Sequence, residues 1–144
     1  MIIIGDTSGL VAALNADDPE QAAARKALTE ASAIVVSPLV FGEIEHIITR
    51  NIGRKSAHAV NDWLLQQERS MRVLIPEVSA PVLRKARTVQ NQYAELRLDL
   101  ADAVNVVLAE QFETDTILTL DRRDFRAIRP LTPHQAFRLL PDDL

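Results

Sequence analysis

The sequence contains no cysteine among its 144 residues, which excludes disulfides, thiolate metal sites and a cysteine nucleophile. This absence is compatible with a reducing compartment. No apolar run approaches the length of a membrane span, and the first acidic residue, Asp6, comes too early for a signal peptide. We therefore expect a soluble, cytoplasmic protein with no membrane contact.

Aromatic residues make up only 4% of the chain, so a platform that stacks nucleic-acid bases is not expected. The net charge of −4 argues against a protein that grips phosphates with its whole surface, although it is compatible with a local basic rim. Hydrophobic residues account for 47% of the chain, which is typical of a globular protein. The length fits a single domain over residues 1–144.

Short β-branched runs alternate with amphipathic segments along the chain. This alternation predicts an α/β fold in which four to five parallel strands form a central sheet with helices on both faces. The expected strands cover residues 2–4, 33–36, 71–75 and 116–120, with a weaker candidate at 127–129. The expected helices cover residues 9–14, 19–30, 39–51, 54–69, 79–95, 98–109 and 135–140. Residues 122–126 are expected to form a polar loop or short turn.

The first expected strand ends at an abrupt change from apolar to polar residues. The run Ile2–Ile4 is typical of a strand buried on both faces, and it delivers Asp6 to the carboxyl end, where open α/β sheets bind ligands. Asp6, Thr7 or Ser8 could equally cap the following helix, since all three side chains accept hydrogen bonds from free N–H groups. The residues of this stretch leave both interpretations open.

Further acidic residues fall at comparable places in the expected fold. Glu43 lies at the margin of an apolar helix face, where it is either directed inward or solvated. Asp102 lies in a helix that is apolar almost all round, where an unpaired carboxylate is costly, and Asn105 follows one turn later. Asp121 follows the fourth strand. Asp99 is explained as the N-cap of the Asp102 helix.

Convergence of these carboxylates at one rim would call for a cation, because mutual repulsion otherwise raises their pKa values. Oxygen ligands without cysteine favour a hard cation, Mg²⁺ or Mn²⁺. Such an ion activates a water and stabilises the charge that develops on a phosphodiester during in-line attack. Hydrolysis of nucleic acid is the reaction that this arrangement predicts.

Four polar or acidic segments follow one another along the chain: Asp6–Ser8, Ser37–Glu43, Leu98–Ala103 and Thr119–Phe125. In this order they resemble the motifs of PIN-domain ribonucleases. In the order and spacing of these segments, the whole chain is similar to a VapC toxin of a type II toxin–antitoxin pair. The resemblance implies a PIN-like three-layer sandwich with one PIN domain over residues 1–144.

The resemblance also implies a Mg²⁺- or Mn²⁺-dependent endoribonuclease. Its catalytic and metal-binding quartet would be Asp6, Glu43, Asp102 and Asp121. The supporting residues would be Thr7, Ser8, Asn105 and Asp124. The candidates for guiding RNA phosphates are Arg122, Arg123 and Arg126. The resemblance further implies homodimers, a VapB-type antitoxin that binds over the catalytic face, and a transfer, ribosomal or messenger RNA substrate.

Other classes of protein also present an acidic pocket on an α/β fold. A phosphatase of the haloacid dehalogenase type would need a second Asp two residues after Asp6, where this chain has Ser8. A receiver domain would need an acidic pair, a central acceptor Asp and a late Lys, and that set is not found. A catalytically inactive PIN-fold module that binds RNA or protein stays open as the alternative.

Overall fold

Five parallel strands form the centre of the molecule, in the order β3-β2-β1-β4-β5. The computed structural model describes residues 1–144. The strands are β1 (Ile2–Gly5), β2 (Ala33–Val35), β3 (Val73–Leu74), β4 (Thr116–Leu118) and β5 (Arg138–Leu140). The helices are α1 (Thr7–Leu14), α2 (Gln21–Glu30), α3 (Pro38–Asn51), α4 (Arg54–Arg69), α5 (Ala80–Gln92), α6 (Leu100–Gln111) and α7 (Arg122–Ala127), and a short 3₁₀ helix, η1, covers Ala94–Leu96.

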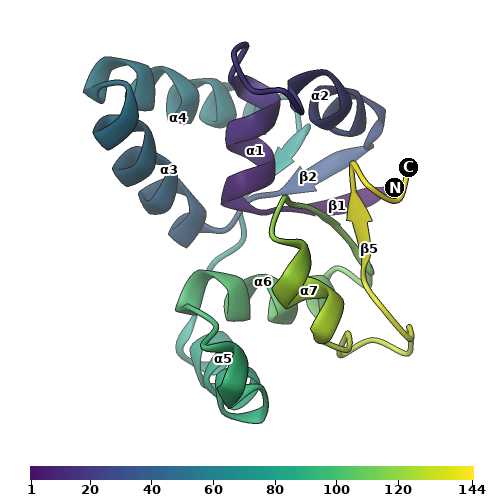
Figure 1. The fold of residues 1–144 in the computed structure, drawn as a ribbon. Helices are drawn as coiled ribbons and strands as arrows, with labels where there is room; N and C mark the ends of the chain where they lie inside the picture. Colours follow the sequence, from purple (N-terminus) through teal and green to yellow (C-terminus); the bar gives the residue numbers. More distant parts are fainter.

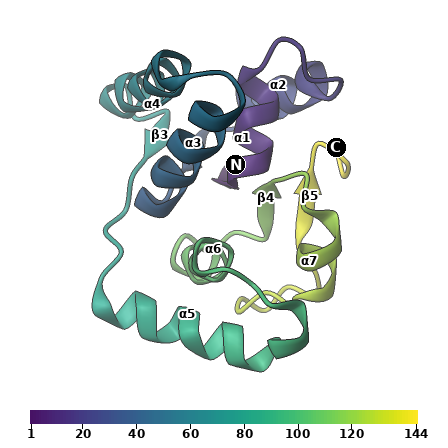
Figure 2. The ribbon, with the colours of Figure 1, turned by 60° about the vertical axis from the view of Figure 1, so that its left-hand side comes forward.

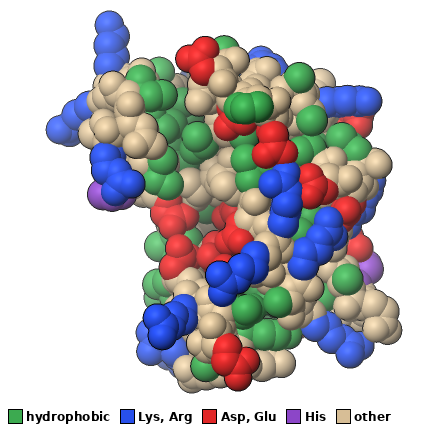
Figure 3. All heavy atoms as spheres, in the orientation of Figure 1, with side chains coloured by type: hydrophobic (Ala, Val, Ile, Leu, Met, Phe, Trp, Pro, Cys, Tyr) green, Lys and Arg blue, Asp and Glu red, His purple; other side chains and the backbone are tan.

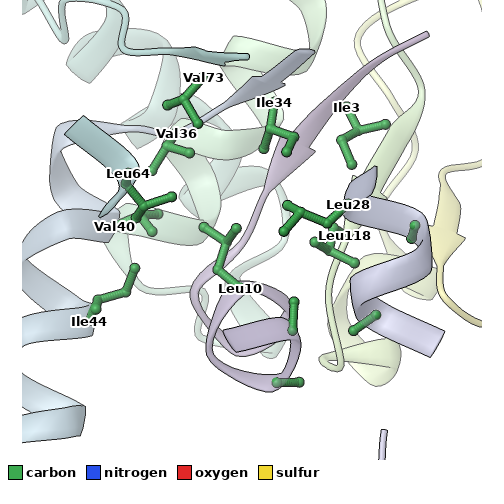
Figure 4. Packing of buried hydrophobic residues seen from close by; sticks show 14 of the residues in the cluster. Ile3, Leu10, Leu28, Ile34, Val36, Val40, Ile44, Leu64, Val73 and Leu118 are labelled. Atoms are coloured by element: carbon green, nitrogen blue, oxygen red, sulfur yellow. The ribbon is translucent and has the colours of Figure 1, made fainter. Parts of the chain in front are cut away.

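Two helical layers enclose the sheet, with α1 to α4 on one face and α5 to α7 on the other (Figure 1, Figure 2). Neighbouring strand residues point to opposite faces, so Ile3 and Ile34 join the core under α1 to α4, while Ile4 and Val35 join the other core. Figure 4 shows Leu10 of α1 among the residues of the first core. The predicted three-layer α/β fold is therefore confirmed.

The position of β1 between β2 and β4 decides where the loops after the strands meet. Ile4 pairs with Val35 of β2 and with Ile117 of β4, and both neighbours run parallel to β1. The carboxyl ends of the three strands therefore lie at one edge of the sheet. None of the helices combines the length and the apolar character needed to span a membrane.

The end of the chain differs from the sequence prediction. Residues 138–140 form β5, so the helix predicted over 135–140 is wrong, and no strand forms at 127–129. Phe137 and Leu139 belong to one core and Leu140 to the other, which is the alternation of a strand. Pairing of this segment with β4 overrides its local helix propensity.

Three helix boundaries also differ. Residues 122–127 form a true helix, α7, where a loop or short turn was predicted, because Phe125 is buried in the core and anchors the segment. Helix α2 begins at Gln21, later than predicted, since a side-chain oxygen of Asp18 accepts a hydrogen bond from Glu20 N and forms a turn there. Helix α5 ends at Gln92, before η1.

Candidate active site

Four acidic side chains from distant parts of the chain line one open pocket of about 390 Å³. Asp6 follows β1, Glu43 lies on α3, Asp102 lies in the first turn of α6, and Asp121 directly precedes α7. The other lining residues are Thr7, Ser8, Val11, Ile47 and Asp99. In Figure 3, acidic side chains gather in the recess between the two helical layers. The structure thus brings the four carboxylates of the expected quartet to one place.

Asp6 lies at the buried end of the pocket. By position it is the N-cap residue of α1, but its side chain makes no capping hydrogen bond and is almost fully buried. The backbone N–H of Asp6 donates to Leu118 O over 3.0 Å, which ties the end of β1 to the end of β4. Of the two interpretations that the sequence left open, the geometry therefore favours a place in the pocket over a helix cap.

Three side chains from three segments donate hydrogen bonds to the Asp6 carboxylate. Asn105 Nδ2 of α6 lies 3.3 Å from Oδ1, while Thr119 Oγ1 and Ser8 Oγ lie 2.7 Å and 3.2 Å from Oδ2. Such donors favour the charged form of a carboxylate and fix its orientation. The carboxylate of Asp6 is therefore held in one position by groups that the fold supplies.

The same hydroxyl groups connect Asp6 to the loop that carries Asp121. Ser8 Oγ accepts a hydrogen bond from Leu120 N over 2.9 Å, and Thr119 Oγ1 accepts one from Asp121 N over 3.0 Å. Each hydroxyl thus accepts from the loop backbone and donates to the carboxylate. The relative position of Asp6 and Asp121 follows from these two bridges.

Gly9 lets α1 approach β4 closely enough for this network. A Cβ atom at Gly9 would lie 2.4 Å from Leu118 O, which is closer than real Cβ atoms come to a backbone oxygen. Any larger residue would push the first turn of α1 away from the end of β4. The hydrogen bond between Ser8 and Leu120 therefore depends on the absence of a side chain at Gly9.

Thr7 and Glu43 form the second connection across the pocket. Thr7 Oγ1 donates to Glu43 Oε1 over 2.6 Å and links the first turn of α1 to α3. Glu43 is only half-buried, and this hydrogen bond holds its carboxylate toward the other acidic groups. Thr7 therefore orients the carboxylate of Glu43, as Thr119 orients the carboxylate of Asp6.

Two helices direct acidic first turns at the pocket. Asp99 caps α6 by accepting a hydrogen bond from Asp102 N over 2.8 Å, and Asp121 caps α7 by accepting one from Asp124 N over 3.3 Å. Carboxylate oxygens of Asp102, Asp121 and Asp124 all lie within 4.8 Å of one another. Asp99 is thus both the predicted cap and a residue of the pocket lining.

The four carboxyl groups repel one another in this arrangement. Burial is the main cause that raises their pKa values above the ordinary range. Burial, together with the charges of Asp6 and Asp99, raises the pKa of Asp102 to about 9. Hydrogen bonds from Thr119 and Ser8 offset part of the increase in the pKa of Asp6. Neutralising charge at the pocket would therefore be favourable.

The chemistry of the donor groups fits a divalent cation with a preference for oxygen ligands. No Lys or Arg forms an ion pair with any member of the quartet. The three grouped carboxylates of Asp102, Asp121 and Asp124 offer hard oxygen ligands, and Asp6 lines the same pocket with its orientation fixed. The negative charge of the quartet thus has no cationic partner within the chain.

Comparison with known families bears directly on this pocket. The sequence pattern of the PIN domain matches residues 3–130, a span that includes all four members of the acidic quartet. The chain belongs to the PIN-domain family. Its relatives include ribonuclease VapC26 from Mycobacterium tuberculosis, which is 36% identical over 130 residues, covering 90% of this chain and 93% of VapC26.

Solved structures share the fold of this PIN domain. The crystal structure of VapC20 from Mycobacterium tuberculosis, described as a sarcin–ricin loop cleaving toxin, has a TM-score of 0.75 and 22% identity. That match covers 85% of this chain and 92% of VapC20. VapBC2 from Rickettsia felis, solved with a DNA fragment from its promoter, has a TM-score of 0.67 and 17% identity, covering 96% of this chain and 98% of the matched one. At these identities the likeness shows the fold alone.

The three arginines of α7 in this PIN domain have different surroundings. Arg122 pairs with Glu20 and with Asp142, and Arg126 pairs with Asp143 over 2.7 Å. These ion pairs hold α7 against the C-terminal residues. The side chain of Arg123 is 82% exposed, and its nearest carboxylate oxygen, on Asp124, lies 3.9 Å away. Arg123 is therefore the one of the three that extends free of a close carboxylate.

Sequence reasoning missed the role of Thr119. Its hydroxyl is buried between Asp6 and Asp121. In the sequence, Thr119 belongs to the fourth motif, but no role was predicted for it. A signal was present, because a threonine near the end of a buried apolar strand needs a hydrogen-bond partner. The identity of that partner depends on which strands are neighbours in the PIN fold.

Proposed function

We propose that this PIN domain is a divalent-metal-dependent endoribonuclease and the toxin of a VapBC-type toxin–antitoxin pair. The observation that carries the proposal is the convergence of Asp6, Glu43, Asp102 and Asp121 on one pocket with no cationic side chain paired to them. The similarity to ribonuclease VapC26 over nearly the whole chain supports the same reaction class. The reaction is hydrolysis of an RNA phosphodiester bond.

Asp102, Asp121 and Asp6 would hold the cation, with Glu43 and Asp124 completing the acidic surroundings. Mg²⁺ or Mn²⁺ is the expected ion, because all of these ligands are hard oxygen donors. When bound, the ion supplies positive charge that stabilises the developing charge on the phosphate.

The residues around the quartet keep the carboxylates in place for this task. Thr119, Ser8 and Asn105 fix the Asp6 carboxylate, and Thr7 fixes that of Glu43. Because these hydrogen bonds exist before any ligand binds, little reorganisation is needed when substrate enters. We therefore assign Thr7, Ser8 and Asn105 supporting roles, as the sequence predicted, and add Thr119.

The proposal extends to the partners of the protein. A VapB-type antitoxin would bind over the acidic pocket, and the substrate would be transfer, ribosomal or messenger RNA. The structural likeness to the VapBC2 protein of Rickettsia felis is consistent with an antitoxin partner. We also propose a homodimer, a cytoplasmic location and a single PIN domain over residues 1–144.

Cleavage of total cellular RNA by the antitoxin-free protein tests the function. Wild type and Asp6→Asn would be compared with Mg²⁺, with Mn²⁺ and with chelator, after circular dichroism has established that both are folded. We expect discrete fragments that require metal and disappear in the variant. Intact RNA in every condition would contradict the nuclease and favour a PIN-fold binding module.

A further inference from the structure

A second hollow of about 490 Å³ lies on the outer side of α3 and the start of α4. It is lined entirely by non-hydrophobic residues, Gly42, Glu45, His46, Thr49, Arg50 and Arg54, and is called the α3–α4 groove below. All six residues lie on the solvent side of the two helices. Figure 3 shows basic and histidine side chains beside the acidic recess on the side where Figure 1 places α3 and α4.

Helical spacing connects this groove to the acidic pocket. His46 and Arg50 follow Glu43 at three and seven positions along α3, so the three side chains share one stripe of the helix. Seven residues correspond to about 10 Å along the helix axis. The groove therefore begins directly beside a carboxylate of the proposed active site and leads away from it.

The two arginines of the groove have no ion-pair partners. Arg50 and Arg54 are exposed and take part in no ion pair, in contrast to Arg122 and Arg126. The one acidic lining residue, Glu45, lies 3.1 Å from His58 of α4, and this contact offsets its charge when the imidazole is protonated. A polar, positively charged groove without apolar lining matches a phosphate backbone better than it matches a protein surface.

Gly42 keeps the floor of the groove open. A Cβ atom added there would meet no atom within 4 Å, so nothing inside the protein requires glycine at this place. Glycine inside a helix is less favourable than alanine. A glycine at this position is explained if another molecule passes close to the helix backbone at Gly42.

We propose that the α3–α4 groove binds the sugar–phosphate backbone of the RNA substrate on one side of the cleaved bond. The proposal rests on the proposed function, since it identifies where the flanking nucleotides of that substrate lie. Arg50 and Arg54 contact phosphate oxygens, His46 and Thr49 donate hydrogen bonds, and the strand passes over Gly42 toward Glu43. The groove recognises the backbone and so adds affinity without base selection.

Fluorescence anisotropy with a short fluorescein-labelled single-stranded RNA of mixed sequence tests the groove. Measurement in EDTA separates binding from cleavage, so the result does not depend on nuclease activity. The test variant is Arg50→Ala/Arg54→Ala. The matched control is Lys26→Ala/Arg69→Ala, which removes the same charge from exposed positions of α2 and of the end of α4. Arg69 lies at the end of α4 that leads into the start of β3, away from the carboxyl ends of the strands.

We expect the test variant to bind RNA about tenfold more weakly than wild type. The slope of log K against log salt should fall by about 1.4, as expected for two lost phosphate contacts with a single strand. The control should stay within about twofold of wild type, because distant exposed charges are screened. This pattern supports the groove even if wild type cleaves no RNA under any metal condition.

Equal RNA binding by wild type and the test variant would overturn the proposal, and so would an equal loss in both double variants. A change in oligomeric state without a change in RNA affinity, measured by light scattering, would assign the groove to a protein partner instead. Gly42→Met provides an independent check, because it fills the floor without changing charge. We expect it to weaken RNA binding while the unfolding midpoint stays at or above that of wild type.

Discussion

Thr119 Oγ1 lies 2.7 Å from Asp6 Oδ2 and donates its hydrogen to that carboxylate. The same oxygen accepts a hydrogen bond from the backbone N–H of Asp121 over 3.0 Å. A single buried hydroxyl therefore forms one of the two bridges between the segments that carry the acidic groups after β1 and β4. Because both bonds are formed inside the protein, removing the hydroxyl leaves the Asp121 N–H without its partner and the Asp6 carboxylate with one donor fewer.

Replacing Thr119 by Val keeps the shape of the side chain and removes this hydroxyl. We expect metal affinity and RNA cleavage to fall by about 10- to 100-fold, as is usual when a residue that orients a ligand is lost. The free energy of unfolding should fall by about 1–3 kcal/mol. Cleavage rates across a Mn²⁺ titration and urea unfolding measure the two effects. Thr119→Ser is the control and should stay near wild type; equal behaviour of the two variants would contradict the assigned role.

The stability of the metal-free protein should depend on pH through Asp102. Its pKa in the folded protein is about 9, above the ordinary value of 3.8, so its stabilising contribution is complete below about pH 4 and is lost as the pH rises toward 9. The Asp102→Asn variant removes this charge and should flatten the profile. Urea unfolding in EDTA between these limits measures the difference. A loss in the variant as steep as that in wild type, or steeper, would contradict the prediction.

Metal should reverse the same loss of stability. At neutral or higher pH, a divalent ion at 100 times its Kd should stabilise wild type by about 2.7 kcal/mol, because it binds the folded state. Asp102→Asn, which lacks one of the proposed ligands, should gain clearly less at the same concentration. Thermal unfolding with Mn²⁺, compared with EDTA, provides the measurement. An equal gain in both proteins would place the ion elsewhere.

Arg122 and Arg123 should respond differently to substitution by Ala. Arg122→Ala breaks the ion pairs to Glu20 and Asp142, so we expect a loss of about 1 kcal/mol in unfolding free energy, with a smaller effect on RNA binding. Arg123→Ala should leave stability unchanged and lower the salt slope of RNA binding by about 0.7. A loss of RNA affinity in Arg122→Ala without a change in stability would contradict this expectation and would mean that Arg122 leaves Glu20 and Asp142 to contact RNA.

Gly9 and Gly42 both lie in helices, and we expect substitution by Ala to change the stability in opposite directions at the two positions. Gly9→Ala places a Cβ atom 2.4 Å from Leu118 O, so α1 must shift, and we expect a loss of about 1–3 kcal/mol together with weaker cleavage. Gly42→Ala meets no neighbouring atom and should raise stability by about 1 kcal/mol. Chemical unfolding of both variants under one set of conditions decides the matter. A loss in the second variant would mean that α3 is constrained there.

Much of the architecture was predictable because it is encoded in short stretches of sequence. The apolar run before Asp6 predicts a buried strand from local composition. Asp99 predicts a helix cap from its place before an apolar helix, and its side chain does accept the hydrogen bond from Asp102 N. Residues 138–140 show the limit of such inference, since their helical composition gives way to pairing with β4.

By itself, the sequence determined the strand–helix alternation, the three-layer fold and the identity of the acidic residues that the fold brings to one edge. The tertiary structure alone decided that Thr119 bridges Asp6 and Asp121, that Arg122 is held by carboxylates, and that Arg50 has no ion-pair partner two turns along α3 from Glu43. The reason is physical. Strand and helix preferences depend on neighbours in sequence, whereas a hydrogen bond between residues 113 positions apart exists only once β1 and β4 have paired.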